Sequence, residues 1–367
     1  MDSVKQLIDS LIKEKGLPYI DVCAWQAHKP VFRYGYNREG EVTGKEPLFL
    51  YSATKPMTVV CAMRLIQEGK LALDEPVSKY LPAYARAYTQ NEKGERVALK
   101  EPMRIWHLFT MTAGLTYNTK TPSIVALQKS NPLAGTVDFV NTFVDEPLSF
   151  PCGERFQYSL CHDVLGAVIE RASGKRFSEY MNETLFSPLG MRDTAFHLDT
   201  AREMTKQYMA NVDGSIEEMA RENSLVFGAN YDSGGAGLCG CVDDYILFAD
   251  ALACDGVAYN GHRILGKSSL DALTDTRVGE ISMKNSYTCV QGNDYGYGLG
   301  VRVRMKDTDW GLQKGEFGWD GAAGTYLMVD REKQISVVIG MHVRAWPHVF
   351  TGEHLRIVEA LYRAIKK

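Results

Sequence analysis

Ser52 and Lys55, in the run Ser52-Ala53-Thr54-Lys55, are the residues whose types and spacing best suit covalent chemistry. A serine hydroxyl is a poor nucleophile at neutral pH and needs a neighbouring base. If a helix begins near the serine, the lysine lies one turn further on the same face, where its amine reaches the hydroxyl. Burial disfavours the charged lysine, so the amine can accept a proton, and N–H groups at the helix start can stabilise negative charge. The spacing therefore predicts nucleophilic acyl transfer.

This spacing alone is not specific. It recurs at Ser10 and Lys13, in a stretch whose periodicity predicts an amphipathic helix, and we assign that copy to a solvated helix face. Taken alone, Ser52 fits equally well as a helix N-cap followed by a surface lysine. The G-x-S-x-G motif of α/β-hydrolases is absent, because no serine has glycine at both the −2 and +2 positions. A Ser-His-Asp hydrolase of that type is therefore not expected.

Other motifs extend the pattern along the chain. Five segments, in order, resemble those of the serine β-lactamase and penicillin-binding-protein superfamily, within it the class C β-lactamase-like branch of family VIII carboxylesterases and acyltransferases. Five segments in one order are far more specific than one motif. They are FLYSATKPMTVVCAMRLIQEGKLALDEPVSKYLP (49–82), IWHLFTMTAGLTY (105–117), PCGERFQYSLCHDVLGAVIE (151–170), GGAGLCGCVDDYILFADAL (234–252) and FGWDGAAGTYLMVDRE (317–332).

The resemblance implies a role for each matching residue. Ser52 would be the acylated nucleophile, Lys55 would hydrogen-bond to it, and the phenol of Tyr158 would lie beside both. Which of Lys55 and Tyr158 takes the first proton stays open, because a coupled pair can share it. The run 319–321 replaces the family's Lys-Thr-Gly, and the backbone N–H groups of Ser52 and Ala322 would form the oxyanion hole. Without the resemblance, Tyr158 would be read as a half-buried aromatic residue.

Departures from the family pattern bear on the substrate. Leu160 stands where β-lactamases and peptidases carry an amide, and Trp319 replaces the lysine or histidine expected to pair with a substrate carboxylate. Asp320 adds negative charge if it faces the cleft, which disfavours an anionic substrate further. With Gly321, and with Tyr117 as an expected wall of the acyl pocket, these residues are the predicted substrate-binding set. They favour a small neutral ester.

Other polar residues receive a lesser role. We assign His162 to structural hydrogen bonding, while His342 and Arg344 end a predicted strand and are candidates for the cleft mouth. Cys239 and Cys241 are the only closely spaced cysteines, but one intervening residue is not a usual zinc spacing. No glycine-rich phosphate loop is present. We therefore expect no metal and no cofactor.

The elements that must position these residues follow from local patterns. Residues 1–15 read as an amphipathic helix, 17–25 and 30–36 as strands, and a helix follows Ser52, with Pro56 in its first turn and Gly69 at its end. After a helix-rich middle, four strand-like runs and a helix close the chain, in segments 295–305, 315–319, 323–330, 335–343 and 353–367.

Together these patterns predict a mixed α/β fold of the β-lactamase/transpeptidase-like type, with a central antiparallel sheet flanked by helices. Residues 1–80 and 286–367 would build the sheet domain, and residues 81–285 a mostly helical inserted domain. The active site would lie in the groove between them.

Composition excludes several classes. Lys and Arg total 41 against 45 Asp and Glu, a net charge of −4, which argues against a general nucleic-acid binder. No run approaches the roughly 18 apolar residues of a membrane-spanning helix. Residues 1–15 lack the pattern of a signal peptide, so we expect a cytoplasmic protein with eight free thiols. The sequence does not predict the oligomeric state.

The predicted function is that of a serine hydrolase forming an acyl-enzyme on Ser52, a carboxylesterase or acyltransferase acting on a small-molecule ester or amide. A β-lactamase or D-amino-acid peptidase of the same fold is the first alternative, and the missing third-motif lysine argues against it. A non-catalytic ligand-binding member is the second, and the retention of Ser52, Lys55 and Tyr158 together argues against that.

Overall fold

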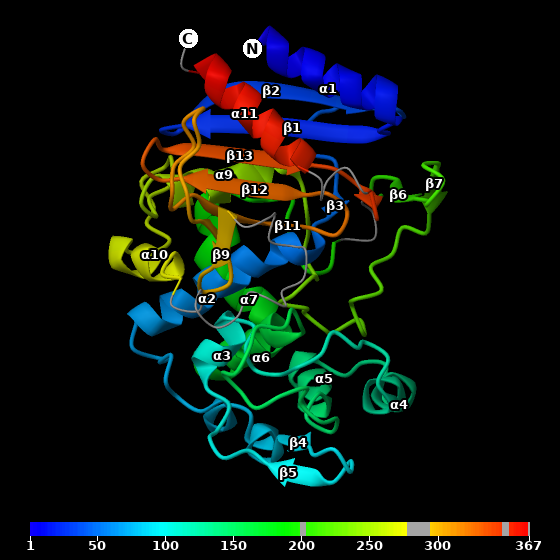
Figure 1. Cartoon of the computed structure of the whole chain (residues 1–367), viewed down its shortest axis with the longest axis vertical. Coiled ribbons are helices and arrows are strands. Elements are labelled where there is room, and N and C mark those ends of the chain that lie inside the picture. Colours follow the sequence, from blue (N-terminus) through cyan, green and yellow to red (C-terminus); the bar gives the residue numbers. More distant parts are fainter. Residues whose placement is uncertain (199–202, 277–293, 347–351, 366–367) are drawn as a thin grey trace.

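A seven-stranded antiparallel sheet organises the molecule (Figure 1). The computed structural model describes residues 1–198, 203–276, 294–346 and 352–365. The strand order is β2-β1-β13-β12-β11-β10-β9, so strands from both ends of the chain meet at the β1–β13 pair. This sheet confirms the predicted fold class. The bounds are Tyr19–Gln26 (β1), Lys29–Asn37 (β2), Tyr295–Tyr297 (β9), Arg302–Arg304 (β10), Phe317–Asp320 (β11), Tyr326–Asp330 (β12) and Ile335–Gly340 (β13).

Helices cover both faces of this sheet. On one face lie α1 (Asp2–Lys15) and α11 (His354–Ile365), which contact each other and pack apolar side chains against β1, β12 and β13. On the other face, α9 (Val242–Ala253) packs against the same three strands. Successive buried residues along each strand point to opposite faces of the sheet, so each strand contributes side chains to both cores.

The helical part is built around α2 (Lys55–Gln67) and α6 (Cys161–Ser173), which pack against each other. As predicted, Pro56 lies in the first turn of α2, and Gly69 follows its end with a φ of 71°. The α6 helix also contacts three short helices. The remaining helices are α3 (Ile105–Phe109), α4 (Pro122–Ser130), α5 (Thr136–Thr142), α7 (Phe177–Met181), α8 (Ser187–Leu189) and α10 (Lys267–Leu273), with 3₁₀ or π turns at Tyr51–Thr54 (η1), Val77–Lys79 (η2), Pro82–Arg86 (η3) and Asn182–Phe186 (η4).

Three small sheets complete the fold. Leu48–Phe49 (β3) pairs with Cys239–Gly240 (β8), which brings the chain before Ser52 beside the glycine-rich segment. Val343–Arg344 (β14) joins Gln207–Ala210 (β6) and Ile216–Met219 (β7). The hairpin of Tyr88–Gln90 (β4) and Arg96–Ala98 (β5) lies at the end of the molecule opposite α1 and α11 (Figure 1).

Two predicted strands differ from the structure. The run 295–305 divides into β9 and β10, because Gly298–Gly300 forms a turn in which Gly300 has a φ of 84°. The run 335–343 ends as a strand of the main sheet at Gly340, and the chain then enters the small sheet through β14. The residues after each break therefore lie in a different strand from the one predicted: β10 pairs with β9, and β14 belongs to a small sheet.

The predicted domain boundary stays a prediction. We note that α9 and β8 fall within residues 81–285, yet α9 packs on the main sheet and β8 pairs with β3. Seven of the eight cysteines lie in described residues and are unpaired, while Cys289 lies outside them. Within the described ranges, every helix is too short or too polar to cross a bilayer.

Candidate active site

Ser52 lies in the 3₁₀ turn η1, directly before α2, and does not cap that helix. Tyr51 before it has a φ of 48°, a left-handed conformation that bulky residues rarely adopt and that concentrates at functional sites. The Tyr51 side chain is buried, and its hydroxyl donates to Gln207 Oε1 at 2.5 Å. The Arg344 guanidinium lies 5.2 Å from the centre of the Tyr51 ring. These contacts hold the strained backbone directly before Ser52, which is itself buried with 9% of its surface exposed.

Lys55 is the first residue of α2 and is fully buried, which contradicts the reading of Ser52 as an N-cap followed by a surface lysine. Its amine donates to Ser52 Oγ at 3.2 Å and to the carbonyl oxygen of Gly235 at 2.7 Å. The amine also lies 4.7 Å from the ring centre of Tyr158. The structure thus brings Ser52, Lys55 and Tyr158 together.

Tyr158 lies within a row of aromatic rings. It stacks with Tyr117 at 5.5 Å and with Trp319 at 5.7 Å between ring centres, and Tyr297 meets Trp319 edge-on at 5.2 Å. The indole N–H of Trp319 donates to the phenol oxygen of Tyr158 at 3.3 Å. Only 2% of Trp319 is exposed, so its main contacts are with protein. Trp319 therefore donates a hydrogen bond to Tyr158 in addition to packing against its ring.

A glycine allows the end of β11 to approach the nucleophile segment. A side chain at Gly321 would begin 2.4 Å from the carbonyl oxygen of Leu50. The Gly321 N–H donates to Thr325 at 2.6 Å, closing the turn that carries Ala322. Ala322 packs against the apolar cluster of Phe49, Tyr51, Cys239 and Ala323, which flanks Ser52. The turn and η1 are therefore close, as an oxyanion hole of Ser52 and Ala322 requires.

Asp320 does not stand as an unbalanced charge at the site. Its Oδ1 accepts from the fully buried guanidinium of Arg302 at 2.9 Å, and Arg302 also donates to the carbonyl oxygen of Leu327 at 2.7 Å. Burial raises the pKa of Asp320, while Arg302 opposes that rise. The expected repulsion of anionic substrates by Asp320 is therefore not supported. Sequence reasoning missed Arg302 because its position beside Asp320 depends on the register of β10 against β11, in which Arg302 pairs with Gly318.

Leu160 precedes α6 and is buried. It lines a small cavity with Leu115, Thr116, Ile124 and Phe143. The cavity adjoins the segment carrying Tyr117, but neither Ser52 nor Lys55 lines it.

His162 and His342 lie inside the protein, whereas Arg344 is half-buried beside the segment that carries Ser52. His162 is buried, its Nε2 lies 3.4 Å from the Phe109 carbonyl oxygen, and burial lowers its pKa to about 3. His342 is also buried, which corrects its placement at the cleft mouth: its Nε2 accepts from the Phe49 N–H at 3.1 Å. Arg344 covers Tyr51. The broken strand at Gly340 explains both placements.

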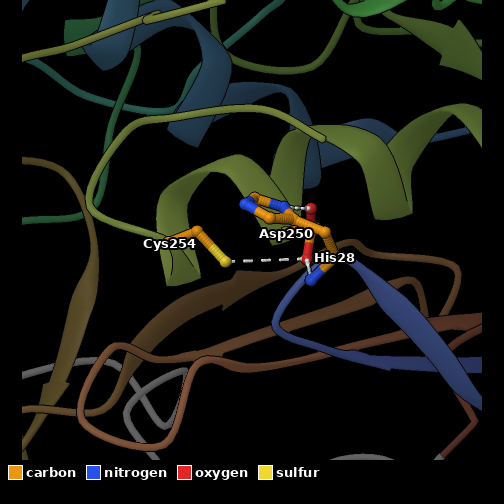
Figure 2. A group of neighbouring side chains, drawn as sticks. All are labelled: His28, Asp250 and Cys254. Atoms are coloured by element: carbon orange, nitrogen blue, oxygen red, sulfur yellow. Dashed lines mark hydrogen bonds and ion pairs between the residues drawn. The ribbon is translucent and has the colours of Figure 1, made fainter. Parts of the chain in front are cut away.

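Two groups of described residues bring three metal-type ligands within 4.8 Å of one another. In the first, shown in Figure 2, both oxygens of Asp250 already accept hydrogen bonds. His28 donates from its backbone N–H to Asp250 Oδ1 at 3.1 Å and from Nδ1 to Asp250 Oδ2 at 2.7 Å. Cys254 Sγ lies 3.8 Å from Asp250 Oδ1. A cation would have to replace these bonds, so we interpret the group as a tether between the β1–β2 turn and α9. In the second group, of Asp193, Cys241 and Asp244, the Asp244 Oδ2 accepts from the Asp193 N–H at 2.7 Å.

Comparison with known proteins places the whole chain. The family model described as Beta-lactamase matches residues 4–362. Esterase EstB of Burkholderia gladioli is 28% identical over 330 residues, 82% of this chain and 78% of that protein. The lovastatin esterase of Penicillium rubens is 26% identical over 317 residues, 78% of this chain and 77% of that protein. The solved structure titled EstCE1, a hydrolase with promiscuous acyltransferase activity, superimposes with a TM-score of 0.81 at 24% identity, covering 98% of each chain.

Proposed function

Since this chain belongs to the Beta-lactamase family, we propose that it is a serine hydrolase that cleaves carboxylic esters through an acyl-Ser52 intermediate. The observation that carries the proposal is the direct contact of Lys55 with Ser52, below a tyrosine that receives the indole hydrogen bond of Trp319. The two esterases related over more than three quarters of the chain support the choice of an ester as substrate.

The proposed reaction has two acyl-transfer steps. Ser52 Oγ attacks the ester carbonyl carbon while its proton passes to the coupled Lys55–Tyr158 pair, and the carbonyl oxygen becomes an oxyanion held by the N–H groups of Ser52 and Ala322. The intermediate collapses, the C–O bond breaks, and the pair returns the proton to the departing alkoxide. A water or alcohol then attacks the acyl-enzyme by the same route in reverse, releasing Ser52.

A neutral substrate fits the charges that line the site. At the third-motif position an indole stands in place of a cation, and the nearby Arg302 is neutralised by Asp320. A β-lactam or peptide carboxylate would therefore lose its hydration without gaining a partner at this position. We propose a small uncharged acyl ester, with Tyr117 beside Tyr158 on the acyl side.

The test is a matched substrate screen. The purified protein should hydrolyse p-nitrophenyl esters of short acyl chains, and Ser52→Ala should abolish turnover. Nitrocefin hydrolysis at a rate comparable to ester hydrolysis would favour the β-lactamase alternative instead. Adding a primary alcohol and quantifying the new ester separates acyl transfer from hydrolysis. Binding of esters without turnover would favour the non-catalytic alternative.

The unpaired cysteines bear on the compartment. Seven described thiols form no disulfide, which suits a reducing environment. We propose that the protein works in the cytoplasm, a proposal that fractionation of the native cells tests directly.

A further inference from the structure

A buried carboxylate, Asp163, lies behind Lys55 and has no part in the reaction described above. Only 2% of it is exposed. Its Oδ1 accepts from the Tyr231 hydroxyl at 2.8 Å and from the Ser233 hydroxyl at 2.6 Å. The backbone N–H of Gly235 also faces the carboxylate. Burying a charge is costly without such partners, so this many donors indicate that the group is held as the anion.

The segment Ser233–Gly235 connects Asp163 to the lysine. The carbonyl oxygen of Gly235 accepts the Lys55 amine at 2.7 Å, while the hydroxyl of Ser233 accepts the Ala236 N–H at 3.0 Å. A side chain at Gly235 would begin 2.4 Å from Asp163 Oδ2 and 3.5 Å from Lys55 Nζ. The carboxylate and the amine therefore both lie close to the position that a side chain of Gly235 would take, and any larger residue would collide with the carboxylate.

Two titratable neighbours of this pair in the described part of the chain carry no charge that could replace Asp163. Burial lowers the pKa of His162 to about 3 and raises that of Cys161 to about 11, so both are neutral near pH 7. Burial raises the pKa of Asp163 itself, and Ser233, Lys55 and Tyr231 oppose that rise. Four tyrosines of the described residues also lie near the pair: Tyr84, Tyr117, Tyr158 and Tyr231.

We propose that Asp163 is a positioning residue: its carboxylate fixes the loop that receives the Lys55 amine and keeps that amine protonated to higher pH. The inference rests on the proposed acyl-enzyme function and deepens it. It assigns the sensitivity of the Ser52 site to pH, in part, to a charge outside the reacting atoms.

The experiment compares pH profiles of kcat/KM for a p-nitrophenyl ester. Asp163→Asn removes the charge and keeps the shape, and Asp163→Ser removes the charge and leaves room for water. Loss of a nearby anion makes Lys55 lose its proton at lower pH. The limb of the kcat/KM profile that reports the ionisation of Lys55 should therefore move toward acid by about 1 to 3 pH units. The direction is the same whether the active lysine is neutral or charged. Ser233→Ala, the matched control, loses one hydrogen bond to Asp163 but keeps the carboxyl group, so its limb should move less than that of either charge-removing variant.

The outcomes separate the two proposals. If both charge-removing variants lose activity while their limbs superimpose on that of the wild type, Asp163 is merely structural and the inference is overturned. A limb that moves equally in Ser233→Ala would also overturn it. Labelling of wild-type Ser52 by a fluorophosphonate in the same preparation tests the function independently. Without that label, the proposed function itself has failed.

Discussion

The hydrogen bond from Trp319 to Tyr158 offers a quantitative test of how the site works. Replacing Trp319 by Phe removes the indole N–H that donates to the phenol oxygen at 3.3 Å, but keeps an aromatic ring between Tyr158 and Tyr297. The distance is at the long end for a hydrogen bond and can shorten when substrate binds. The substitution therefore probes one polar contact with limited change in packing.

The size of the effect depends on the charge that Tyr158 carries in the transition state. A hydrogen bond between neutral groups contributes about 0.5–1.5 kcal/mol, and one to a charged group about 1.5–3 kcal/mol. With about 1.4 kcal/mol for each tenfold change, kcat/KM should fall about 2- to 12-fold if the phenol stays neutral and about 12- to 140-fold if it becomes a phenolate.

A double-mutant cycle isolates this contact. Initial rates with p-nitrophenyl butyrate are measured for the wild type, Trp319→Phe, Tyr158→Phe and the double variant, with urea unfolding as a check on stability. In the Tyr158→Phe background the phenol oxygen is gone, so Trp319→Phe should cost little more. An equal loss in both backgrounds would refute the reasoning and show that Trp319 acts through packing.

Three further predictions concern stability. Ala27 has a φ of 49°, so Ala27→Gly should stabilise the fold by about 0.5–1 kcal/mol in urea unfolding, and destabilisation would contradict the strain. Arg302→Met should cost about 3–5 kcal/mol, because it leaves the largely buried Asp320 and the fully buried Glu316 without their shared cation. Adding Asp320→Asn should recover part of that cost, and a double variant as unstable as the single would exclude the Arg302–Asp320 pair as a cause. The folded-state pKa of His342 is lowered to about 4, below the ordinary 6.5, so its contribution is present above pH 6.5 and is lost as pH falls toward 4, by about 3 kcal/mol. His342→Gln should flatten that part of the pH dependence in thermal melts, and an unchanged curve would show that His342 is not its source.

Local patterns predicted much of the fold. The apolar stripe of residues 1–15 and the strands at 17–25 and 30–36 depend on neighbouring residues only, and they correspond to α1, β1 and β2. The order of five motifs likewise predicted that Ser52 and Lys55 would lie together near Tyr158, although the residues' roles remain predictions.

Long-range pairing decided what the sequence did not reveal. Asp320 contacts Arg302 because of the register of β10 against β11, which no local pattern encodes. The position of His342 depends on the chain leaving the main sheet after Gly340. Asp163, five residues after Tyr158, stood within a recognised motif, but its partners Tyr231 and Ser233 come from a loop far along the chain.

The central claim is that Ser52 becomes acylated. Its most direct test is mass spectrometry of the protein after treatment with a fluorophosphonate, with peptide mapping of the modified site and Ser52→Ala treated in parallel. We predict one adduct per chain on the peptide that contains Ser52, with loss of ester turnover, and no adduct on Ser52→Ala. An adduct on another residue, or ester turnover that persists in Ser52→Ala, would contradict the proposed mechanism.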